Sequence, residues 1–172
     1  LDSDGKAHGP FDGVISTAPA PQALELLLPL ATRFEEIAKV GMAPCWAVMV
    51  AFDRAVPTPF DALLHPGPAI SWASKTEGKG PGHPELWVSH ASADWSRAHL
   101  ENNADQVAND LMAEFEPALG ANLPSVVSIS AHRWRYARTE TPLGKSHLSG
   151  VNGRIIAAGD WCLGARVEAA FR

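Results

Sequence analysis

The clearest hydrophobic pattern in the chain lies between residues 103 and 119. Asn103 can cap the start of a helix there, and Gly120 can end it. The apolar positions recur at intervals of three and four, at Val107, Ala108, Leu111, Met112, Phe115 and Leu119. This spacing places one apolar stripe along a single side of an α-helix. We therefore predict one long amphipathic helix that faces a core.

Shorter apolar runs bounded by glycine, proline or acidic residues have the pattern of strands. The predicted strands cover residues 11–19, 44–52, 61–65, 69–75, 85–90, 126–137 and 155–158. Those between 61 and 90 are expected to pair as an antiparallel sheet, with a flexible turn at 78–82. Shorter helices are predicted at 21–28, at 31–40 and at 95–99, the last capped by Ser92 or Asp94.

The order of these elements predicts two parts. Residues 1–40 and 151–172 have the elements of one α/β unit, and residues 41–150 have those of an α+β region built on an antiparallel sheet. The chain begins without Met or a signal-like segment, so we expect it to be a piece of a longer protein. Its exposed sheet edges would then be covered by a missing N-terminal half or by a second copy in a homodimer.

Composition narrows the partners of the protein. Fourteen Lys and Arg residues against nineteen Asp and Glu give a formal charge of -5, without a basic run, which disfavours nucleic acid and anionic membrane surfaces. No stretch is apolar and long enough for a membrane helix. Cys45 and Cys162 lie far apart and outside any CxxC motif, which indicates two free thiols and a cytoplasmic protein.

The last twenty residues carry the most specific signal. Residues 155–158 form an apolar run that fits a strand covered on both faces, and Gly159 and Asp160 end it. Gly164 allows close approach of the backbone to a ligand, and residues 167–171 have the composition of a helix start. A carboxylate at a strand end can hold sugar hydroxyls, and a helix N-terminus favours an anionic group.

Other motifs are weaker or fail. The seven histidines show no spacing typical of a metal site, so no metal is expected. Gly144-Lys145-Ser146 resembles the end of a P-loop, but Thr139 stands where that motif requires its first glycine. A serine nucleophile elbow, Gly-x-Ser-x-Gly, is absent from the sequence. The acidic Asp160 could also act only as a cap of the following turn.

Three stretches resemble the renalase-like group of flavin-dependent oxidoreductases, within the flavin amine oxidase class. They are Phe11-Asp-Gly-Val-Ile-Ser-Thr-Ala-Pro19, His132-Arg-Trp-Arg-Tyr-Ala137 and Ala158-Gly-Asp-Trp-Cys-Leu-Gly-Ala-Arg-Val-Glu-Ala-Ala170. The similarity extends over nearly the whole chain, and the third stretch is the most specific. The resemblance implies a fold like that of p-hydroxybenzoate hydroxylase, with part of an FAD-binding dinucleotide domain and a substrate domain on an antiparallel sheet.

The resemblance also implies roles for individual residues. Asp160 would contact the ribityl or pyrophosphate part of FAD, and the backbone at Arg166 and Val167 would face the N1 and C2 carbonyl edge of its ring. Trp134, Tyr136 and Trp72 would shape a substrate pocket, although Trp134 and Tyr136 could equally be sheet-packing aromatics. The implied reaction is hydride transfer from a dihydronicotinamide-type or amine substrate to flavin, with oxygen reoxidising the flavin to give hydrogen peroxide.

Some family features are missing from the sequence, and two alternatives remain open. No Gly-x-Gly-x-x-Gly loop occurs, since Gly78-x-Gly80 leads to His83, so we expect the chain alone to be inactive. A flavin monooxygenase using NAD(P)H would share the fold, and a non-catalytic α+β module would dock a partner protein. Arg133 and Arg135 are expected to be solvated, and His90 and His132 to lie at the surface or in satisfied contacts.

Overall fold

The computed structural model describes residues 3–65, 67–76 and 84–171. The chain divides into two compact units, which we describe separately. Unit 1 comprises Leu1–Met42 and Arg138–Arg172, and unit 2 comprises Ala43–Ala137. Residues 138–150, placed in the substrate domain from sequence, lie in unit 1. The turn predicted at 78–82 lies outside the described residues.

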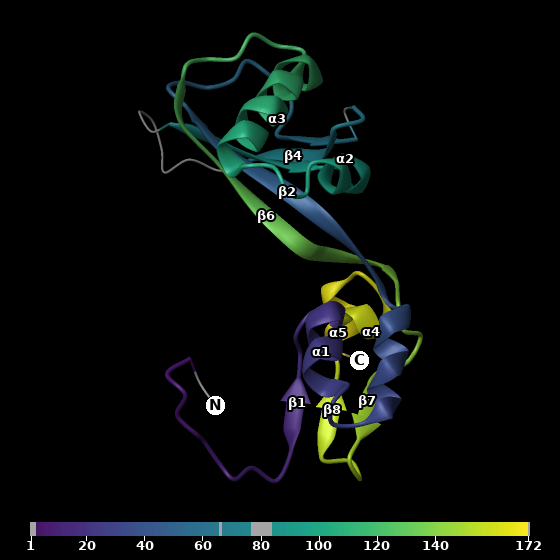
Figure 1. The fold of residues 1–172 in the computed structure, drawn as a ribbon. Helices are drawn as coiled ribbons and strands as arrows, with labels where there is room; N and C mark the ends of the chain where they lie inside the picture. The colour runs from purple at the N-terminus through teal and green to yellow at the C-terminus, as the bar shows by residue number, and fades with distance from the viewer. Residues whose placement is uncertain (1–2, 66, 77–83, 172) are drawn as a thin grey trace. The chain divides into compact units, whose positions relative to one another are not determined.

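A small sheet forms the centre of unit 1 (Figure 1). Its three strands lie in the order β1 (Val14–Ser16), β8 (Ile155–Ala157) and β7 (Leu148–Gly150). β8 pairs in parallel with β1 and antiparallel with β7. The sequence did not predict β7, because three residues are too few to show a periodic pattern.

One face of this sheet is covered by α1 (Ala20–Leu27) and the 3₁₀-helix η1 (Thr32–Lys39). α1 agrees with the helix predicted at 21–28, whereas the second helix has 3₁₀ geometry, which is common in short connectors. The buried core beneath them consists of Ala20, Ala23, Leu27, Phe34, Ile37, Leu148, Ala157, Trp161 and Cys162. These residues come from both ends of the chain, so unit 1 forms only when the two ends meet.

The opposite face of the sheet in unit 1 is not covered by the described residues. Ile15 is 66% exposed, and its neighbour across the strands, Ile156, is only half-buried. The expectation that residues 155–158 are covered on both faces is therefore wrong within this chain. Parallel strand pairs usually have both faces buried, so this apolar face is typical of a surface that something else covers.

Unit 2 is built on a sheet of five strands. In spatial order these are β3 (Ala62–Leu64), β4 (Ile70–Thr76), β5 (Glu85–Ala91), β2 (Gly41–Phe52) and β6 (Val126–Thr141). β3 pairs antiparallel with β4, β4 with β5, and β5 with β2. The antiparallel pairing predicted for residues 61–90 is confirmed.

Two helices of unit 2 begin where the sequence predicts. α2 (Ala93–Ala98) is capped by Ser92, whose Oγ accepts a hydrogen bond of 3.2 Å from the Trp95 N–H. α3 (Ala104–Leu119) is capped by Asn103 and ends at Gly120, whose φ of 64° is left-handed. A glycine adopts this conformation without a Cβ clash. Among the described residues, none of the helices is long and apolar enough to cross a membrane.

The stripe of α3 packs on one face of the sheet, which we call the inner face. Val48, Val50 and Phe52 of β2, Ala73 of β4 and Trp87 of β5 share this core with Val107, Leu111, Phe115 and Leu119 of α3. The Phe115 ring stacks on Phe52 with centroids 6.4 Å apart and meets the edge of Trp87 at 5.7 Å. The opposite side of the sheet is called the outer face.

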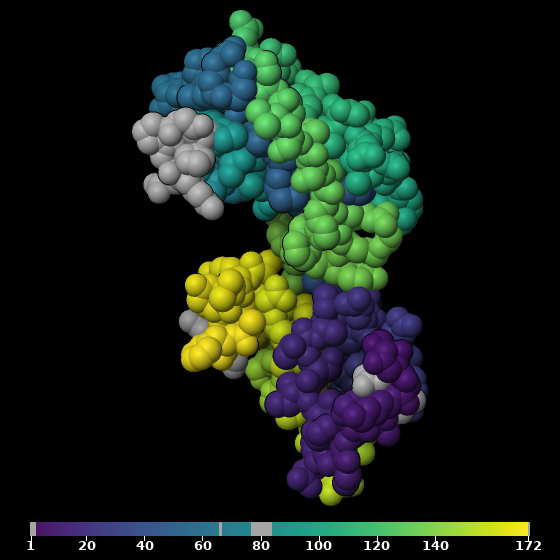
Figure 2. Space-filling view, turned by 90° about the vertical axis from the view of Figure 1, so that its left-hand side faces the viewer, coloured from purple at the N-terminus to yellow at the C-terminus, as the bar shows by residue number. Residues whose placement is uncertain are grey.

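The end of the chain contains two short helices, α4 (Asp160–Leu163) and α5 (Val167–Phe171). The sequence predicts α5 and reads residues 160–163 only as a turn. Figure 2 shows the last residues, in yellow, at the surface, and Val167 and Phe171 are 86% and 93% exposed. An apolar helix with such exposure has no core of its own within the described residues.

Candidate functional site: an aromatic sheet face and an acidic turn

The outer face of unit 2 carries a row of aromatic side chains. Trp72 of β4 and Ala47 of β2 are both cross-strand partners of His90 on β5, so the three share one face. Ala47 lies between Trp46 and Val48, which point into the core. Because side chains alternate along a strand, this face is the outer one. The Trp72 and His90 rings lie 4.9 Å apart with a tilt of 43°.

The edge strand β6 adds a second aromatic pair to the outer face. Ile129 and Ala131 pack against the inner core, so alternation turns His132, Trp134 and Tyr136 outward. The rings of His132 and Trp134 meet edge to face at 4.7 Å, and Trp134 is 56% exposed. The three residues predicted to shape a substrate pocket, which include Trp72, thus lie on one face of one sheet.

The charged side chains of β4 and β5 point to the other side. Lys75 and Glu85 alternate with the outer positions of β4 and β5, and each has a partner. Lys75 pairs with Asp61 at 2.5 Å, and Glu85 accepts a hydrogen bond of 2.7 Å from the indole of Trp87. The outer positions in the described pairings of β2, β3, β4 and β5 therefore carry no Asp, Glu, Lys or Arg. On β6, Arg138 and Glu140 follow Tyr136 at the same alternate positions.

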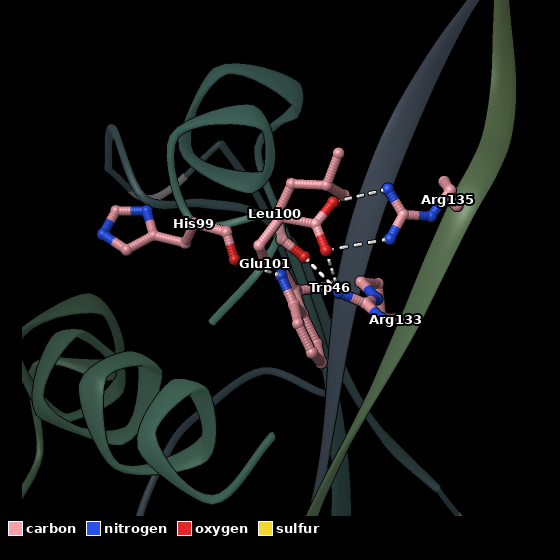
Figure 3. A network of polar contacts seen from close by, with 6 residues as sticks. All are labelled: Trp46, His99, Leu100, Glu101, Arg133 and Arg135. Carbon is pink, nitrogen blue, oxygen red and sulfur yellow. Dashed lines mark hydrogen bonds and ion pairs between the residues drawn. The ribbon is translucent and has the colours of Figure 1, made fainter. Parts of the chain in front are cut away.

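Arg133 and Arg135 are not simply solvated, which corrects the expectation from sequence. Both bind Glu101, in the connection between α2 and α3 (Figure 3). Arg135 donates through two guanidinium nitrogens, at 2.6 and 3.0 Å. Arg133 Nη1 donates to the second carboxylate oxygen at 3.0 Å and to the Leu100 carbonyl at 2.6 Å. We call these three charged side chains the Glu101 clamp.

The Glu101 clamp ties β6 to the inner side of the sheet. Trp46 on the adjacent strand β2 donates its indole N–H to the His99 carbonyl at 3.0 Å, and Arg133 lies 5.7 Å from its ring (Figure 3). The hydrogen bonds from Arg135 and Arg133 hold the pKa of Glu101 below its usual value. The two arginines of the clamp flank Trp134, which points the opposite way.

His90 is the ionisable group at the paired outer positions of β2, β4 and β5. Burial lowers the pKa of His90, because partial desolvation disfavours the imidazolium form. The neighbouring positions on β4 and β2 are Trp72, Ser74, Ala47 and Met49, which carry no charge. The surroundings of His90 therefore favour its neutral imidazole form.

Asp160 lies in unit 1, just beyond the carboxyl end of β8. Gly159 precedes it, and a Cβ there would meet the Trp161 indole at 2.7 Å, so the position requires glycine. Trp161 is buried and donates its indole N–H to the Ala18 carbonyl at 3.1 Å. Asp160 is half-buried and lies in the first turn of α4. A carboxylate held in this way can accept hydrogen bonds from hydroxyls of a ligand.

Arg166 and Val167 are exposed in unit 1, Arg166 between the two short helices and Val167 as the first residue of α5. Gly164 has a φ of 153°, and a Cβ there would meet nothing within 4 Å, so a ligand has room beside the backbone. The helix expected near Arg166 is α5, which has only five residues, and short helices sum few peptide dipoles. The Arg166 N–H itself donates to the Gly164 carbonyl at 2.8 Å, so it is not free to bind an anion in this conformation. A flavin therefore fits this segment by its hydroxyls, which the Asp160 carboxylate can bind.

Sequence reasoning missed the Glu101 clamp. An acidic residue 32 and 34 positions from its two arginines carries no local signal, and only the pairing of β6 beside β2 brings them together. The contacts of His90 with Trp72 and of His132 with Trp134 were also not predicted from the sequence. Among the described residues, no three His, Cys, Asp or Glu side chains lie close enough to hold a metal ion.

A family model settles the class of the protein. The model for flavin-containing amine oxidoreductases matches residues 1–172. The chain belongs to this family. The family is one of flavin-containing enzymes, as the resemblance of its C-terminal stretch indicates.

Solved structures of similar fold are oxidoreductases. A proposed protoporphyrinogen oxidase from an Exiguobacterium species matches with a TM-score of 0.70 and 16% identity, over 92% of this chain and 38% of that one. Cyclohexylamine oxidase from Brevibacterium oxydans matches with a TM-score of 0.58 and 12% identity, over 93% and 40%. An oxidoreductase from Methanosarcina mazei matches with a TM-score of 0.59 and 17% identity, over 93% and 41%. The chain thus spans about two fifths of the length of these proteins.

Proposed function

We propose that this chain works within an FAD-dependent oxidoreductase that oxidises a dihydronicotinamide-type or amine substrate. The observation that carries the proposal is the family match over all 172 residues. When bound, FAD supplies the acceptor for a hydride from a substrate C–H bond, and oxygen then takes two electrons and two protons to give hydrogen peroxide. The cytoplasm remains the proposed compartment.

Unit 1 would hold part of the cofactor at the turn after β8. Asp160 would accept hydrogen bonds from ribityl or ribose hydroxyls, and the backbone at Arg166 and Val167 would face the ring edge that becomes negative on reduction. Fixed N–H groups stabilise such charge without reorganising. The half-buried position of Asp160, just after the carboxyl end of β8, supports this role.

Unit 2 would contribute the substrate side through its outer face. Trp134, Tyr136 and Trp72 offer flat surfaces that orient a ring-shaped substrate, and hydride transfer depends strongly on orientation. A strong acid or base is not needed for such a transfer. The absence of charged residues at the paired outer positions of β2, β4 and β5 is consistent with an apolar binding surface.

Because the similar structures are longer than this chain, we propose that the remaining cofactor contacts come from a partner segment. The candidates are an N-terminal dinucleotide-binding segment or a second copy of this chain. On this proposal the chain alone does not reduce flavin. A mixture of the chain with free FAD and substrate, followed by absorbance at the flavin band, tests that expectation.

Release of the cofactor tests the proposed function itself. The chain is purified together with its proposed partner segment and denatured, and the supernatant is analysed for FAD by chromatography with fluorescence detection. We expect FAD to be released, and Asp160→Ala to lower its content several-fold. Glu168→Gln is the matched control, because it removes the charge of an exposed acidic residue in the same C-terminal segment. This variant should retain FAD. Absence of any flavin in the unaltered protein would overturn the proposal, and unchanged content in Asp160→Ala would remove the role of Asp160.

A further inference from the structure

One buried tryptophan joins three segments of unit 1 beside Asp160. The indole N–H of Trp161 donates to the carbonyl of Ala18, in the segment after β1, at 3.1 Å. Its backbone carbonyl accepts a hydrogen bond of 3.0 Å from the N–H of Leu143, in the loop after β6. The side chain is 1% exposed, and a Cβ at Gly159 would lie 2.7 Å from the indole nitrogen. Trp161 therefore connects the chain after β1, after β6 and after β8.

The neighbouring hydrogen bonds fix the same arrangement. The Gly144 N–H donates to the Cys162 carbonyl at 2.9 Å, which holds residues 142–145, called the 142–145 loop below, against α4. The Gly164 N–H donates to the carbonyl of Asp160 at 2.8 Å. The backbone that carries the Asp160 carboxylate is thus fixed by contacts on both sides.

We propose that Trp161 is a positioning residue for FAD, which holds Asp160 and the 142–145 loop in one arrangement before the cofactor binds. This inference rests on the proposed function, in which the Asp160 carboxylate accepts hydrogen bonds from hydroxyls of FAD. A site that is already ordered binds its ligand more tightly, because less conformational freedom is lost on binding. In this proposal Trp161 acts through Asp160 and the loop, and makes no contact with FAD itself.

An ion pair at the same loop could hold it without Trp161, so the two contributions have to be compared. Lys145 binds Glu36 of η1, but the two side chains are 47% and 29% exposed. Ion pairs at such exposure contribute little, because water and salt screen them. The hydrogen bonds from the loop end at the carbonyls of two buried residues, Trp161 and Cys162. A bond lost there leaves a polar group without a partner, so these bonds should hold the loop more firmly than the ion pair.

Trp161 is also part of the core of unit 1, and a core role alone predicts a different result. Loss of core packing lowers the free energy of unfolding, whichever ligand is bound. Loss of positioning lowers the affinity for FAD in a protein that still folds, and it alters the surroundings of the bound flavin. The test therefore needs a second buried tryptophan whose loss affects packing alone.

Trp161→Phe and Trp87→Phe form this matched pair. Trp87 is also buried, and its indole donates to Glu85 at 2.7 Å in unit 2. Each change removes one indole hydrogen bond and part of a ring. The chain is prepared with its proposed partner segment, stripped of FAD and titrated with FAD, with flavin fluorescence as the signal. We expect Trp161→Phe to bind FAD roughly fivefold or more weakly, and Trp87→Phe to bind it like the unaltered complex.

Visible circular dichroism of the bound flavin gives a second readout. This signal responds to the surroundings of the flavin ring and not to the free energy of unfolding. The spectrum of bound FAD should change in Trp161→Phe, because the Asp160 turn has shifted, and should stay the same in Trp87→Phe.

A pair of glycine variants repeats the test without removing a core side chain. Gly144 and Gly120 have φ values of 79° and 64°, and a Cβ at either position would meet nothing within 4 Å. Alanine therefore adds backbone strain alone at both positions. Gly144→Ala should weaken FAD binding several-fold, because the strained backbone loosens its bond to the Cys162 carbonyl. Gly120→Ala, at the end of α3 in unit 2, should leave FAD binding unchanged. This pair replaces the tryptophan pair if Trp161→Phe does not unfold cooperatively.

The outcomes separate this inference from the proposed function. Weaker FAD binding and a changed flavin spectrum in Trp161→Phe, with neither change in Trp87→Phe, support the inference. An equal loss of FAD affinity within either matched pair overturns it, since Trp161 would then act only as a core residue. Unchanged affinity in both Trp161→Phe and Gly144→Ala overturns it as well, and leaves the proposed function intact. Absence of FAD from the unaltered complex overturns the proposed function and this inference together.

Discussion

The sheets of the two units each have one covered and one uncovered face. The uncovered faces differ in how usual an exposed apolar surface is for that type of sheet. In unit 1 the open face shows Ile15 and Ile156 on a parallel strand pair, and parallel sheets normally have both faces buried. In unit 2 the sheet is antiparallel, and such a sheet usually turns polar residues outward. Its outer face instead shows Trp72 and Trp134. An apolar face is ordinary for the parallel strand pair of unit 1 and unusual for the antiparallel sheet of unit 2, where we propose that it contacts the substrate.

The covered faces also differ in how they are made. In unit 2 the apolar stripe of one long helix, α3, covers the inner face from one continuous segment. Unit 1 has a core of small helices and short strands drawn from both ends of the chain. Local patterning therefore controls most of unit 2, whereas unit 1 depends on contacts between segments more than a hundred residues apart.

The largest expected effect is on the inner face of unit 2. Phe115→Ala removes a ring that is 1% exposed and touches Phe52 and Trp87, and such a change costs about 3–5 kcal/mol of unfolding free energy. Leu64→Ala on the outer face, at a residue 75% exposed, should change stability by about 0.5 kcal/mol or less. Urea unfolding followed by circular dichroism measures both. Equal losses would mean that the outer face is buried in solution.

A smaller effect is expected from tight packing in unit 1. A Cβ at Gly150 would lie 2.8 and 2.9 Å from two ring atoms of the buried Phe34, so Gly150→Ala should cost about 1–3 kcal/mol. At Gly67 a Cβ would meet nothing within 4 Å. Gly67→Ala should therefore be neutral or stabilising by at most about 1 kcal/mol. Thermal unfolding measures the stability of both variants. An unchanged melting temperature of Gly150→Ala would contradict the packing of η1 on β7.

The smallest effect concerns the Glu101 clamp, because its side chains are largely exposed. Its arginines lower the pKa of Glu101 in the folded protein, so the stabilisation is present above the unfolded pKa, near 4.5, and is lost as the pH falls through the folded value. Glu101→Gln should thus be slightly less stable than the unaltered protein at pH 7, and the difference should shrink towards pH 3.

Asp94→Asn is the control for the clamp. Asp94 pairs with Arg97 within α2 at 2.8 Å and does not reach β6. Hydrogen exchange of the β6 amides should increase in Glu101→Gln and remain unchanged in Asp94→Asn. An increase in both variants would show that general charge loss, and not the clamp, loosens the edge strand.

Much of the fold could be predicted because its signals are local. The caps at Asn103 and Ser92, the stripe of α3 and the antiparallel strands between 61 and 91 all depend on neighbours within a few residues. Elements of only three or four residues were harder to predict from the sequence. The strand β7 and the single turn of α4 are held by their pairing and packing against distant segments, which no short pattern records.

The sequence by itself determined the residue types of the candidate site and their family. Strand alternation was enough to put Trp134 and Tyr136 on one face and Arg133 and Arg135 on the other. Only the tertiary structure decided that Trp72 and His90 lie on the same face as Trp134, and that Glu101 binds both arginines. The physical reason is that alternation is a property of one strand, whereas the order and pairing of strands depend on the whole sheet. The charge of a face is therefore visible only once the sheet has formed.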